Sequence, residues 1–166
     1  KKYDGVVVDL SENTGGDMSP MISGLSALLP DGELMNFVDR KGRKMPVTLS
    51  NGKISSGGSS ISLEEKAKVK KVPIAVIIGE NTGSSGELTA LAFEGMKKVK
   101  FFGKPSYGFT SGNSQFELYD GRLLMLTTMK ITDRTKKEYF NDKIKPDVET
   151  DTPIEDAIIW LNSKIQ

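Results

Sequence analysis

The chain has 166 residues, of which 37% are hydrophobic and 27% are charged, and its formal net charge is +1. This composition is ordinary for a globular domain large enough to bury a core. It lacks the concentrated positive charge of a nucleic-acid-binding protein, so we expect no nucleic-acid partner. No apolar run reaches the ~18 residues that a membrane-spanning helix needs, so contact with a membrane would require an anchor outside these residues.

Two residue types are missing from the sequence, and each absence excludes a chemistry. There is no cysteine, which excludes disulfides and thiolate metal sites, and we expect neither a metal nor a cofactor. There is also no histidine, so a Ser-His-Asp triad cannot be completed within these residues.

The first elements are a strand and a helix. Gly5 to Leu10 is a continuous, β-branched run, which is typical of a strand covered on both faces. Because this strand begins almost at once, without a signal-peptide pattern, we expect the chain to begin inside a larger protein. Ser19 as N-cap and Pro20 as first helical residue predict a helix that stops at residues 30–32.

The next stretch predicts a hairpin followed by irregular structure. Leu34 to Leu49 alternates like two strands around a turn at Lys41-Gly42. Residues 55–60, Ser-Ser-Gly-Gly-Ser-Ser, predict a mobile loop. The charged residues 64–71 predict a short helix or a linker.

The second half predicts a strand, a helix, and then further strands and a final helix. Val72 to Gly79 is a second buried strand, and a helix follows from Ser84 to about Met96. The remaining elements are a strand at Val99–Phe102, a hairpin at Phe116–Ile131 turning at Asp120-Gly121, and a helix opened by a Thr152–Glu155 capping box, with Ile154, Ala157, Ile158 and Leu161 inward. This order predicts an α/β fold with a partly parallel, mixed sheet and helices packed on it.

The turn into the second helix has the features of a nucleophile site. A strand-to-helix turn at Ser84 lifts one side chain above the sheet edge, and the following amides favour an oxyanion. Glycines at 83 and 86 permit a substrate backbone to approach closely. Ser84-x-x-Glu87 is also an ordinary capping box, and the two interpretations are not exclusive.

A second loop with chemical potential follows the first strand. Asp9 to Gly16 reads Asp-Leu-Ser-Glu-Asn-Thr-Gly-Gly. Loops at the carboxyl ends of neighbouring parallel strands converge, so this loop is expected to approach Ser84 and to offer a second oxyanion amide. A tight turn that needs glycine for steric reasons is the alternative.

Taken together, five motifs in order resemble the S41 family of serine peptidases, nearly from end to end. They are Val-Val-Val-Asp-Leu-x-x-Asn-x-Gly-Gly, the run from Pro73 to Glu87, Gly103-x-Pro-x-x-Gly108-x-Thr110, Leu-x-Leu-Thr127 and Pro146-Asp147. The resemblance implies a ClpP/crotonase-like fold of stacked β-β-α units with its nucleophile at a helix N-terminus.

The resemblance also implies the roles of single residues. The family's nucleophile, three residues before the motif glutamate, maps to Ser84, and Glu87 supports the helix cap. The oxyanion hole would be formed by the amide of Ser85 and by that of Gly15 or Gly16, of which we favour Gly15.

The chain departs from the family pattern at two places. Processing peptidases of the family place a lysine base after the glycine that corresponds to Gly108, whereas this chain has Phe109. The tricorn-like branch places a glutamate before the asparagine at 141, where this chain has Phe140, which leaves Glu138 and Asp142 as candidate supporting acids.

Short features within these motifs look most like the nisin-resistance group of the family. That group takes its base, a histidine, from the part of the catalytic region that precedes this chain. The resemblance then implies a bacterial, extracytoplasmic, envelope-anchored serine peptidase acting on extended peptide or protein substrates. Residues 1–166 would then be a single catalytic-domain fragment that lacks its amino-terminal part, and the isolated chain would be weakly active or inactive.

Two other functions use the same fold. One is a non-catalytic domain that binds peptides or other ligands, to which the loss of the acid at position 140 would point. The other is an acyl-transfer enzyme that uses the same oxyanion geometry on a thioester.

Overall fold

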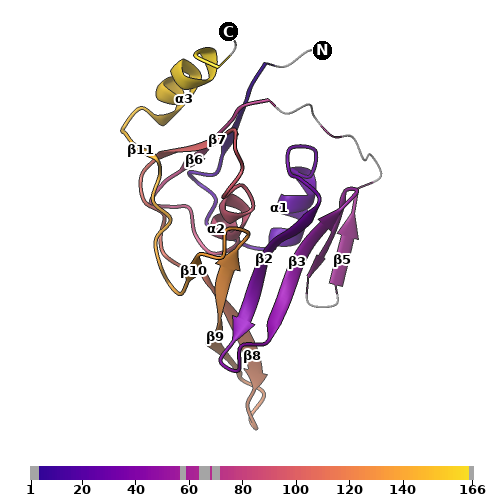
Figure 1. Ribbon diagram of the computed structural model, residues 1–166. Coiled ribbons are helices and arrows are strands. Elements are labelled where there is room, and N and C mark those ends of the chain that lie inside the picture. Colours follow the sequence, from indigo (N-terminus) through magenta and orange to yellow (C-terminus); the bar gives the residue numbers. More distant parts are fainter. Residues whose placement is uncertain (1–3, 57–58, 64–67, 69–71, 165–166) are drawn as a thin grey trace.

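Two β-sheets and three helices make up the part of the chain that this computed structural model describes, residues 4–56, 59–63, 68 and 72–164 (Figure 1). The smaller sheet is parallel, in the order β1-β6-β7-β11, with β1 at Val6–Asp9, β6 at Ile74–Ile78, β7 at Val99–Gly103 and β11 at Val148–Glu149. The larger sheet is antiparallel, in the order β10-β9-β2-β3-β4-β5 with β8 paired to β9; its strands are β2 (Gly32–Asp39), β3 (Lys44–Ser50), β4 (Lys53–Ser56), β5 (Ser59–Ser62), β8 (Ser111–Glu117), β9 (Leu123–Asp133) and β10 (Glu138–Tyr139). The helices are α1 (Met18–Gly24), α2 (Ser85–Leu91) and α3 (Pro153–Asn162).

The parallel sheet separates two apolar clusters. Alternate residues of β6 point to opposite faces, and all of them are buried. Ile74, Val76 and Ile78 join the main core with α1 and α2. Ala75 faces the other way and packs with Ala157 and other residues of α3. The predicted buried strand is therefore confirmed as a central strand of the sheet.

The helix that carries the candidate site lies inside the molecule. Every residue of α2 is buried, and Leu88 and Leu91 pack in one cluster with residues of both sheets. Burial of these side chains is worth about 1.5–3 kcal/mol each, so packing fixes α2 although it is only seven residues long. The start of α2 thus has a rigid frame. Within the described residues, no helix is long and apolar enough to cross a membrane.

These elements confirm the predicted α/β fold and both predicted hairpins. They also confirm the predicted strands that correspond to β1, β6 and β7. One detail that was predicted for the first strand is wrong. β1 lies at the edge of its sheet among the described strands, and Val7 and Asp9 are exposed. The strand is therefore not covered on both faces, although its apolar run suggested this.

The ends of α1 and α2 differ from the prediction. α1 begins at Met18 because Asp17, not Ser19, is the N-cap: its carboxylate accepts the amide of Ser19 at 2.8 Å. α2 ends at Leu91 rather than near Met96, and the chain continues in turns.

Helix α3 differs from the prediction in its cap and in its buried face. Thr152 is the N-cap, but its side chain makes no cap hydrogen bond. Instead, the hydroxyl of Thr150 donates to Asp156 at 2.5 Å. Of the residues predicted to face inward, Ala157 and Leu161 are buried, whereas Ile154 and Ile158 are exposed at 46% and 47%. One narrow stripe of α3 therefore suffices to cover the sheet.

The serine- and glycine-rich stretch is a hairpin in its described part, not a mobile loop. Ser55 pairs with Ser60 and Ser56 pairs with Ser59, while residues 57–58 lie outside the described residues. The ladder between β3 and β4 supplies backbone hydrogen bonds that composition alone did not indicate. Of residues 64–71 only Lys68 is described, so the predicted helix or linker lies outside the described residues.

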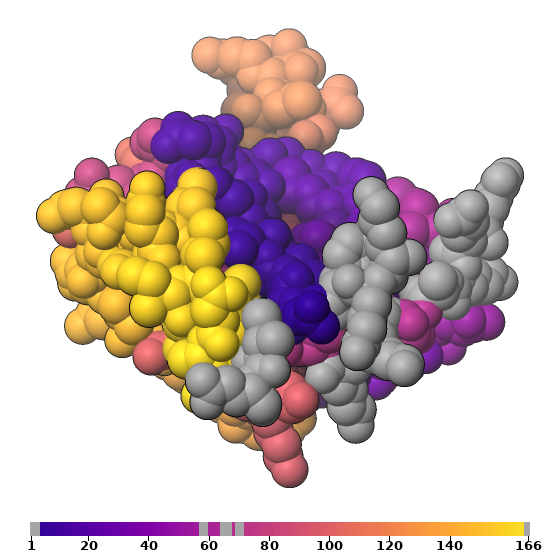
Figure 2. Space-filling view, turned by 90° about the horizontal axis from the view of Figure 1, so that it is seen from above, coloured from indigo at the N-terminus to yellow at the C-terminus, as the bar shows by residue number. Residues whose placement is uncertain are grey.

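Strands β8 and β9 form a hairpin that projects from the body of the protein (Figures 1 and 2). The first half of β9, Leu123 to Met125, pairs only with β8 among the described strands. Several large apolar side chains of this hairpin are exposed: Phe116, Leu118, Tyr119, Leu123, Leu124, Met125 and Leu126.

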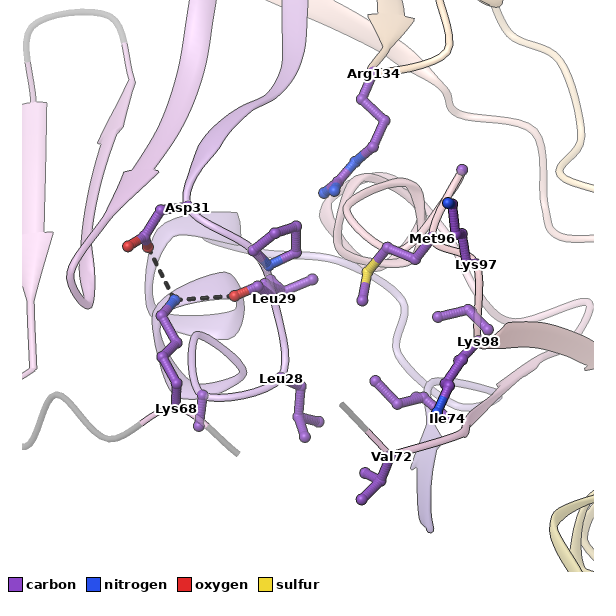
Figure 3. A pocket seen from close by; sticks show the side chains of 14 residues that line it. Leu28, Leu29, Asp31, Lys68, Val72, Ile74, Met96, Lys97, Lys98 and Arg134 are labelled. Atoms are coloured by element: carbon purple, nitrogen blue, oxygen red, sulfur yellow. Dashed lines mark hydrogen bonds and ion pairs between the residues drawn. The ribbon is translucent and has the colours of Figure 1, made fainter. Parts of the chain in front are cut away.

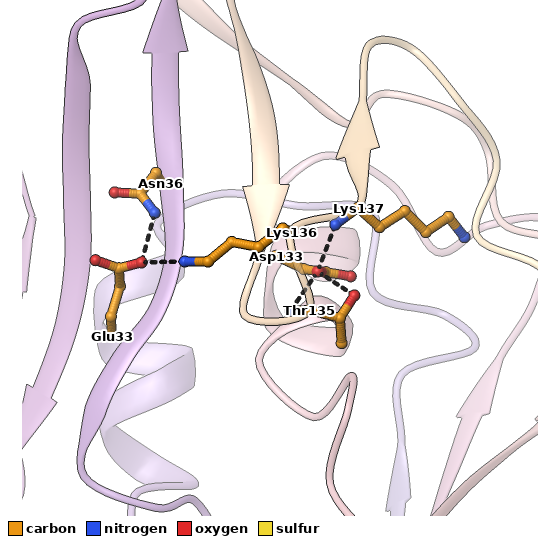
Figure 4. Close-up of polar contacts among 6 residues, drawn as sticks. All are labelled: Glu33, Asn36, Asp133, Thr135, Lys136 and Lys137. Carbon is orange, nitrogen blue, oxygen red and sulfur yellow. Dashed lines mark hydrogen bonds and ion pairs between the residues drawn. The ribbon is translucent and has the colours of Figure 1, made fainter.

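A buried carboxylate organises the turn between β9 and β10 (Figure 4). Asp133 accepts the amides of Thr135 and Lys137 at 2.7 and 3.1 Å and the hydroxyl of Tyr139 at 3.0 Å. Burial raises the pKa of the Tyr139 hydroxyl, which keeps this donor protonated. The same turn places the Arg134 guanidinium on the carbonyl of Ala92 at 2.6 Å, at the end of α2.

Glu94, next to this turn, gives the fold a pH dependence. Burial, and secondly the charge of Asp133, raise the pKa of the Glu94 carboxyl above its ordinary value of 4.5. The unfolded chain therefore loses this proton at a lower pH than the folded chain does, and stability falls as the pH rises above 4.5.

Glu94→Gln is accordingly expected to raise the free energy of unfolding at pH 7, because the amide carries no charge to desolvate. The gain should shrink below pH 4.5, where the carboxyl of the parent chain is protonated in both states. Urea unfolding of both proteins at pH 7 and pH 4 measures this difference. The exposed Glu117→Gln serves as control, and equal stability of parent and Glu94→Gln at pH 7 would contradict the expectation.

Candidate active site

Ser84 sits at a strained turn between β6 and α2. Its backbone angles are φ +51° and ψ −120°, a region that residues with a side chain rarely occupy. Such a conformation costs about 1–3 kcal/mol and persists only where its surroundings enforce it. Strained strand-to-helix turns of this kind present the nucleophile of α/β-hydrolases.

Thr82 ties this turn to the end of β1. Its hydroxyl donates to the carbonyl of Leu10 at 2.8 Å and accepts the amide of Gly79 at 2.8 Å. Thr82 is fully buried, so these bonds are shielded from water. The carboxyl ends of the neighbouring strands β1 and β6 are thereby joined on the side where Ser84 lies.

Ser84→Gly is expected to raise the free energy of unfolding by about 1 kcal/mol, because relief of the strain exceeds the extra entropy of the unfolded glycine chain. Ser84→Ala keeps the strain and is the matched control. Thermal unfolding of the two variants measures the difference. A glycine variant no more stable than the alanine variant would show that the turn is unstrained.

The loop after β1 packs directly on the turn. A Cβ placed on Gly15 would lie 3.0 Å from Cβ of Ser84 and 3.4 Å from the amide nitrogen of Ser85. The Ser85 hydroxyl donates to the carbonyl of Gly16 at 2.6 Å. The four residues expected to form the nucleophile and the oxyanion hole are therefore neighbours in space.

The two glycine amides of this loop differ in their partners. The amide of Gly15 donates to the side chain of Asn13 at 3.1 Å. The amide of Gly16 has no acceptor among the described residues. Both glycines have φ near +120°, which a residue with a side chain rarely adopts.

Gly86 makes room for the loop after β1. A Cβ on Gly86 would lie 2.3 Å from the carbonyl oxygen of Asn13. The amide of Gly83 donates to this same carbonyl at 3.0 Å. At Gly86 the backbone that approaches closely is therefore that of the loop after β1, whereas at Gly83 the approach of a substrate stays a prediction.

Gly86→Ala is expected to cost about 3 kcal/mol of stability, because the new methyl must displace the Asn13 carbonyl. Gly24→Ala is the control: the last residue of α1 has no atom within 4 Å of the new Cβ, and the change should be neutral or slightly stabilising. Equal unfolding midpoints in urea for the two variants would rule out the close contact.

Glu87 joins the turn at Ser84 to a second loop. Its fully buried carboxylate accepts four hydrogen bonds. One oxygen, Oε2, accepts the amides of Ser84 and Phe109, each at 2.8 Å. The other, Oε1, accepts the Ser106 hydroxyl at 2.5 Å and the Gly108 amide at 2.8 Å. We call these five residues the Glu87 clamp.

The remaining predicted residues have other partners. Glu138 forms an ion pair with Lys130 at 2.6 Å, and the Asp142 carboxylate accepts the amide of Phe140 at 2.9 Å. Lys104 pairs with Asp151 at 2.8 Å, and this pairing raises the pKa of the ammonium group. No described group of three or more acidic side chains is arranged to hold a metal ion.

Sequence reasoning did not assign roles to three residues that build the site: Asn13, Thr82 and Ser106. Asn13 and Thr82 lie inside the quoted motifs, so their presence was a signal, but their partners are distant in sequence. Ser106 also accepts the amide of Ile144 at 2.7 Å and had no signal beyond its place between a proline and a glycine.

A largely apolar pocket of about 640 Å³ lies at the other end of the parallel sheet (Figure 3). Ile74 and Val99, the first residues of β6 and β7, line it together with Leu28 and Met96. At one side the Lys68 ammonium bonds to Asp31 at 2.9 Å. Since Ser84 follows the carboxyl end of β6, this pocket is separate from the candidate active site.

Two curated proteins are similar to this chain in sequence. A nisin-resistance protein from Lactococcus lactis subsp. lactis is 52% identical over 99% of this chain and 52% of its own length. A probable CtpA-like serine protease from Staphylococcus aureus strain N315 is 29% identical over 89% of this chain and 27% of its own length. The chain therefore spans about half or less of the curated relatives it matches.

Two solved structures resemble this chain in fold. A lipoprotein from Streptococcus agalactiae superimposes with a TM-score of 0.83 and 41% identity, over 99% of this chain and 56% of that chain. The photosystem II D1 C-terminal processing protease shares the fold, with a TM-score of 0.65 and 22% identity over 89% of this chain and 35% of that chain. The model of peptidase family S41 matches residues 1–150. A match over that extent confirms the resemblance read from the motifs: the chain belongs to peptidase family S41.

Proposed function

We propose that this chain is the nucleophile-bearing part of a serine peptidase in which Ser84 attacks the peptide carbonyl. The observation that carries the proposal is the strained, half-buried Ser84 packed against Gly15 and beside the amide of Ser85. The neighbouring serine is a weaker candidate, because the hydroxyl of Ser85 already donates to the Gly16 carbonyl.

In the proposed reaction, a base takes the proton of the Ser84 hydroxyl as its oxygen bonds to the carbonyl carbon. The resulting oxyanion accepts hydrogen bonds from the amide of Ser85 and from a glycine amide of the loop after β1. The protonated base then gives its proton to the departing amine, which leaves an acyl group on Ser84. Water hydrolyses this ester and restores the hydroxyl.

Gly16 is now the stronger candidate for the second oxyanion donor. Its amide has no acceptor among the described residues, whereas the Gly15 amide is engaged by Asn13. The close approach of Gly15 to Ser84 remains necessary to bring the loop into place.

The base is proposed to be a histidine outside these residues. The chain contains no histidine, Lys104 is paired with Asp151, and Phe109 stands where processing peptidases carry their lysine. The supporting acid is also proposed to lie outside these residues, because Glu138 and Asp142 have partners of their own. Ser84 and the amides proposed to bind the oxyanion therefore form half of an active site.

Extended peptides or proteins are the proposed substrates, and the bacterial cell envelope is the proposed location. Support comes from the S41 match and from two similar proteins, one named for nisin resistance and one described as a lipoprotein. The alternative is a binding domain derived from the same fold, which would retain peptide but not cleave it.

Peptide cleavage by the longer protein that we propose carries this chain, compared with cleavage by residues 1–166 alone, tests the proposal. The longer protein should cleave peptides, and the isolated chain should not, because it lacks the base. Efficient cleavage by the isolated chain would refute a base outside it. Peptide binding without cleavage by the longer protein would favour the binding domain.

A further inference from the structure

Two exposed aromatic rings lie in contact beside the nucleophile turn. Tyr107 and Phe109 are 55% and 53% exposed, and their ring centroids are 4.4 Å apart with an interplanar angle of 42°. The Cβ of Tyr107 lies 3.6 Å from where a Cβ on Gly83 would be, one residue before Ser84. Single exposed apolar side chains are common, but a contacting pair of large rings next to a site marks a contact surface.

The backbone beneath these rings is fixed at every residue. The amide of Ser106 donates to the carbonyl of Ile144 at 2.9 Å, and that of Tyr107 to the carbonyl of Thr82 at 2.8 Å. The amides of Gly108 and Phe109 donate to Glu87, each at 2.8 Å. Rings held on a rigid backbone lose little further entropy on binding, which favours recognition.

The ring pair is tied to Ser84 through a single oxygen atom. The amides of Ser84 and Phe109 both donate to Oε2 of Glu87. The backbones that carry the nucleophile and the ring thus lie on either side of one buried atom. A peptide whose carbonyl is at Ser84 therefore has its neighbouring side chains within reach of the rings.

One cationic residue, Lys143, lies beside the backbone that carries the rings. The stem of Lys143 passes Gly108, with its Cγ 3.3 Å from where a Cβ on that glycine would be. The carboxylate of Glu87 is buried and fully engaged by four donors. An apolar side chain carries no charge for the lysine to repel, and it would cover the apolar surface of both rings.

We propose that Tyr107 and Phe109 form an apolar subsite that binds a bulky apolar side chain of the peptide substrate next to the scissile bond. The subsite rests on the proposed peptidase function and names a preference of that site. In an enclosed hydrophobic pocket, one methylene of a substrate changes kcat/KM by about 10- to 200-fold. Because the rings are half open to water, we expect the lower end, about tenfold in kcat/KM.

The test uses the longer protein and peptides in which one leucine, serine or lysine is moved through the positions around the scissile bond. At one position the leucine peptide should have about tenfold higher kcat/KM than the serine peptide. Phe109→Ala should bring this ratio close to one, and Phe109→Leu should keep most of it. Tyr119→Ala, which removes a fully exposed ring at the tip of the β8–β9 hairpin, should leave it unchanged.

The ratio of two peptides within one variant is independent of a general loss of activity or folding. An unchanged leucine-to-serine ratio in both Phe109→Ala and Tyr107→Ala, or a preference for lysine, would overturn the subsite. Reaction of the unaltered protein with a fluorophosphonate, which has no peptide side chain, separates the two proposals. Absence of a Ser84 adduct would count against the peptidase function itself, whereas an adduct with unchanged ratios counts only against the subsite.

Discussion

Replacing Ser84 by alanine in the longer protein is expected to lower kcat/KM for peptide cleavage by on the order of 10⁴-fold or more. The alanine has no oxygen to attack the carbonyl, and the remaining oxyanion amides give only residual catalysis. The backbone at residue 84 should keep its conformation, because Glu87 and the loop after β1 hold it from both sides. Steady-state kinetics on a cleaved peptide measures the loss.

Ser85→Ala is the matched control for this experiment. It removes a hydroxyl one residue away that donates to Gly16, but it keeps the Ser85 amide that we assign to the oxyanion hole. A loss of about tenfold or less is expected, through looser placement of the loop. If Ser85→Ala were as inactive as Ser84→Ala, or if Ser84→Ala kept full activity, the assignment of the nucleophile would be wrong.

Glu87→Ala is expected to have the largest effect on stability, a loss of about 4 kcal/mol in the free energy of unfolding. Four donors would lose their fully buried acceptor: three amides and the Ser106 hydroxyl. Each buried, unsatisfied donor costs about 1–3 kcal/mol, and partial relaxation reduces the total. Urea unfolding followed by circular dichroism measures this loss.

Glu87→Gln and Ser106→Ala test how separate parts of the Glu87 clamp contribute to stability. Glutamine keeps the volume but presents an NH₂ group to donors on one side, so we expect a smaller loss, about 2 kcal/mol. Ser106→Ala removes one donor to Glu87 and also leaves the buried Ile144 amide without its acceptor, so a loss of about 2 kcal/mol is expected. If Glu87→Ala were no less stable than Ser106→Ala, the carboxylate would not be the shared acceptor of the two loops.

The turn at Ser84 could be predicted because its signals are local. A buried β-branched run, then glycines and serines, then a glutamate three residues after Ser84 specify a strand, a turn and a helix start. The amide of Ser84 does donate to Glu87, as that spacing favours. Convergence of the loops after β1 and β6 followed from the parallel pairing of these strands.

The second half of the Glu87 clamp could not be predicted, because its partners are 19 to 22 residues away and no pattern links them. The hairpin of β4 and β5 was missed for a related reason: its pairing with β3 decides its structure, not its serine-rich composition. On α3, helical periodicity indicated an apolar face that includes Ile154 and Ile158, but these two side chains are exposed, and Ala157, Trp160 and Leu161 pack on the sheet.

Mapping a fluorophosphonate adduct on the longer protein by mass spectrometry tests the central claim most directly, because only an activated serine forms this bond. The account predicts one adduct on the peptide that contains residues 83–87, located on Ser84 and absent from the Ser84→Ala variant. It also predicts far slower reaction of residues 1–166 alone, which lack the base. An adduct on Ser85, or equally fast labelling of the isolated chain, would contradict the account.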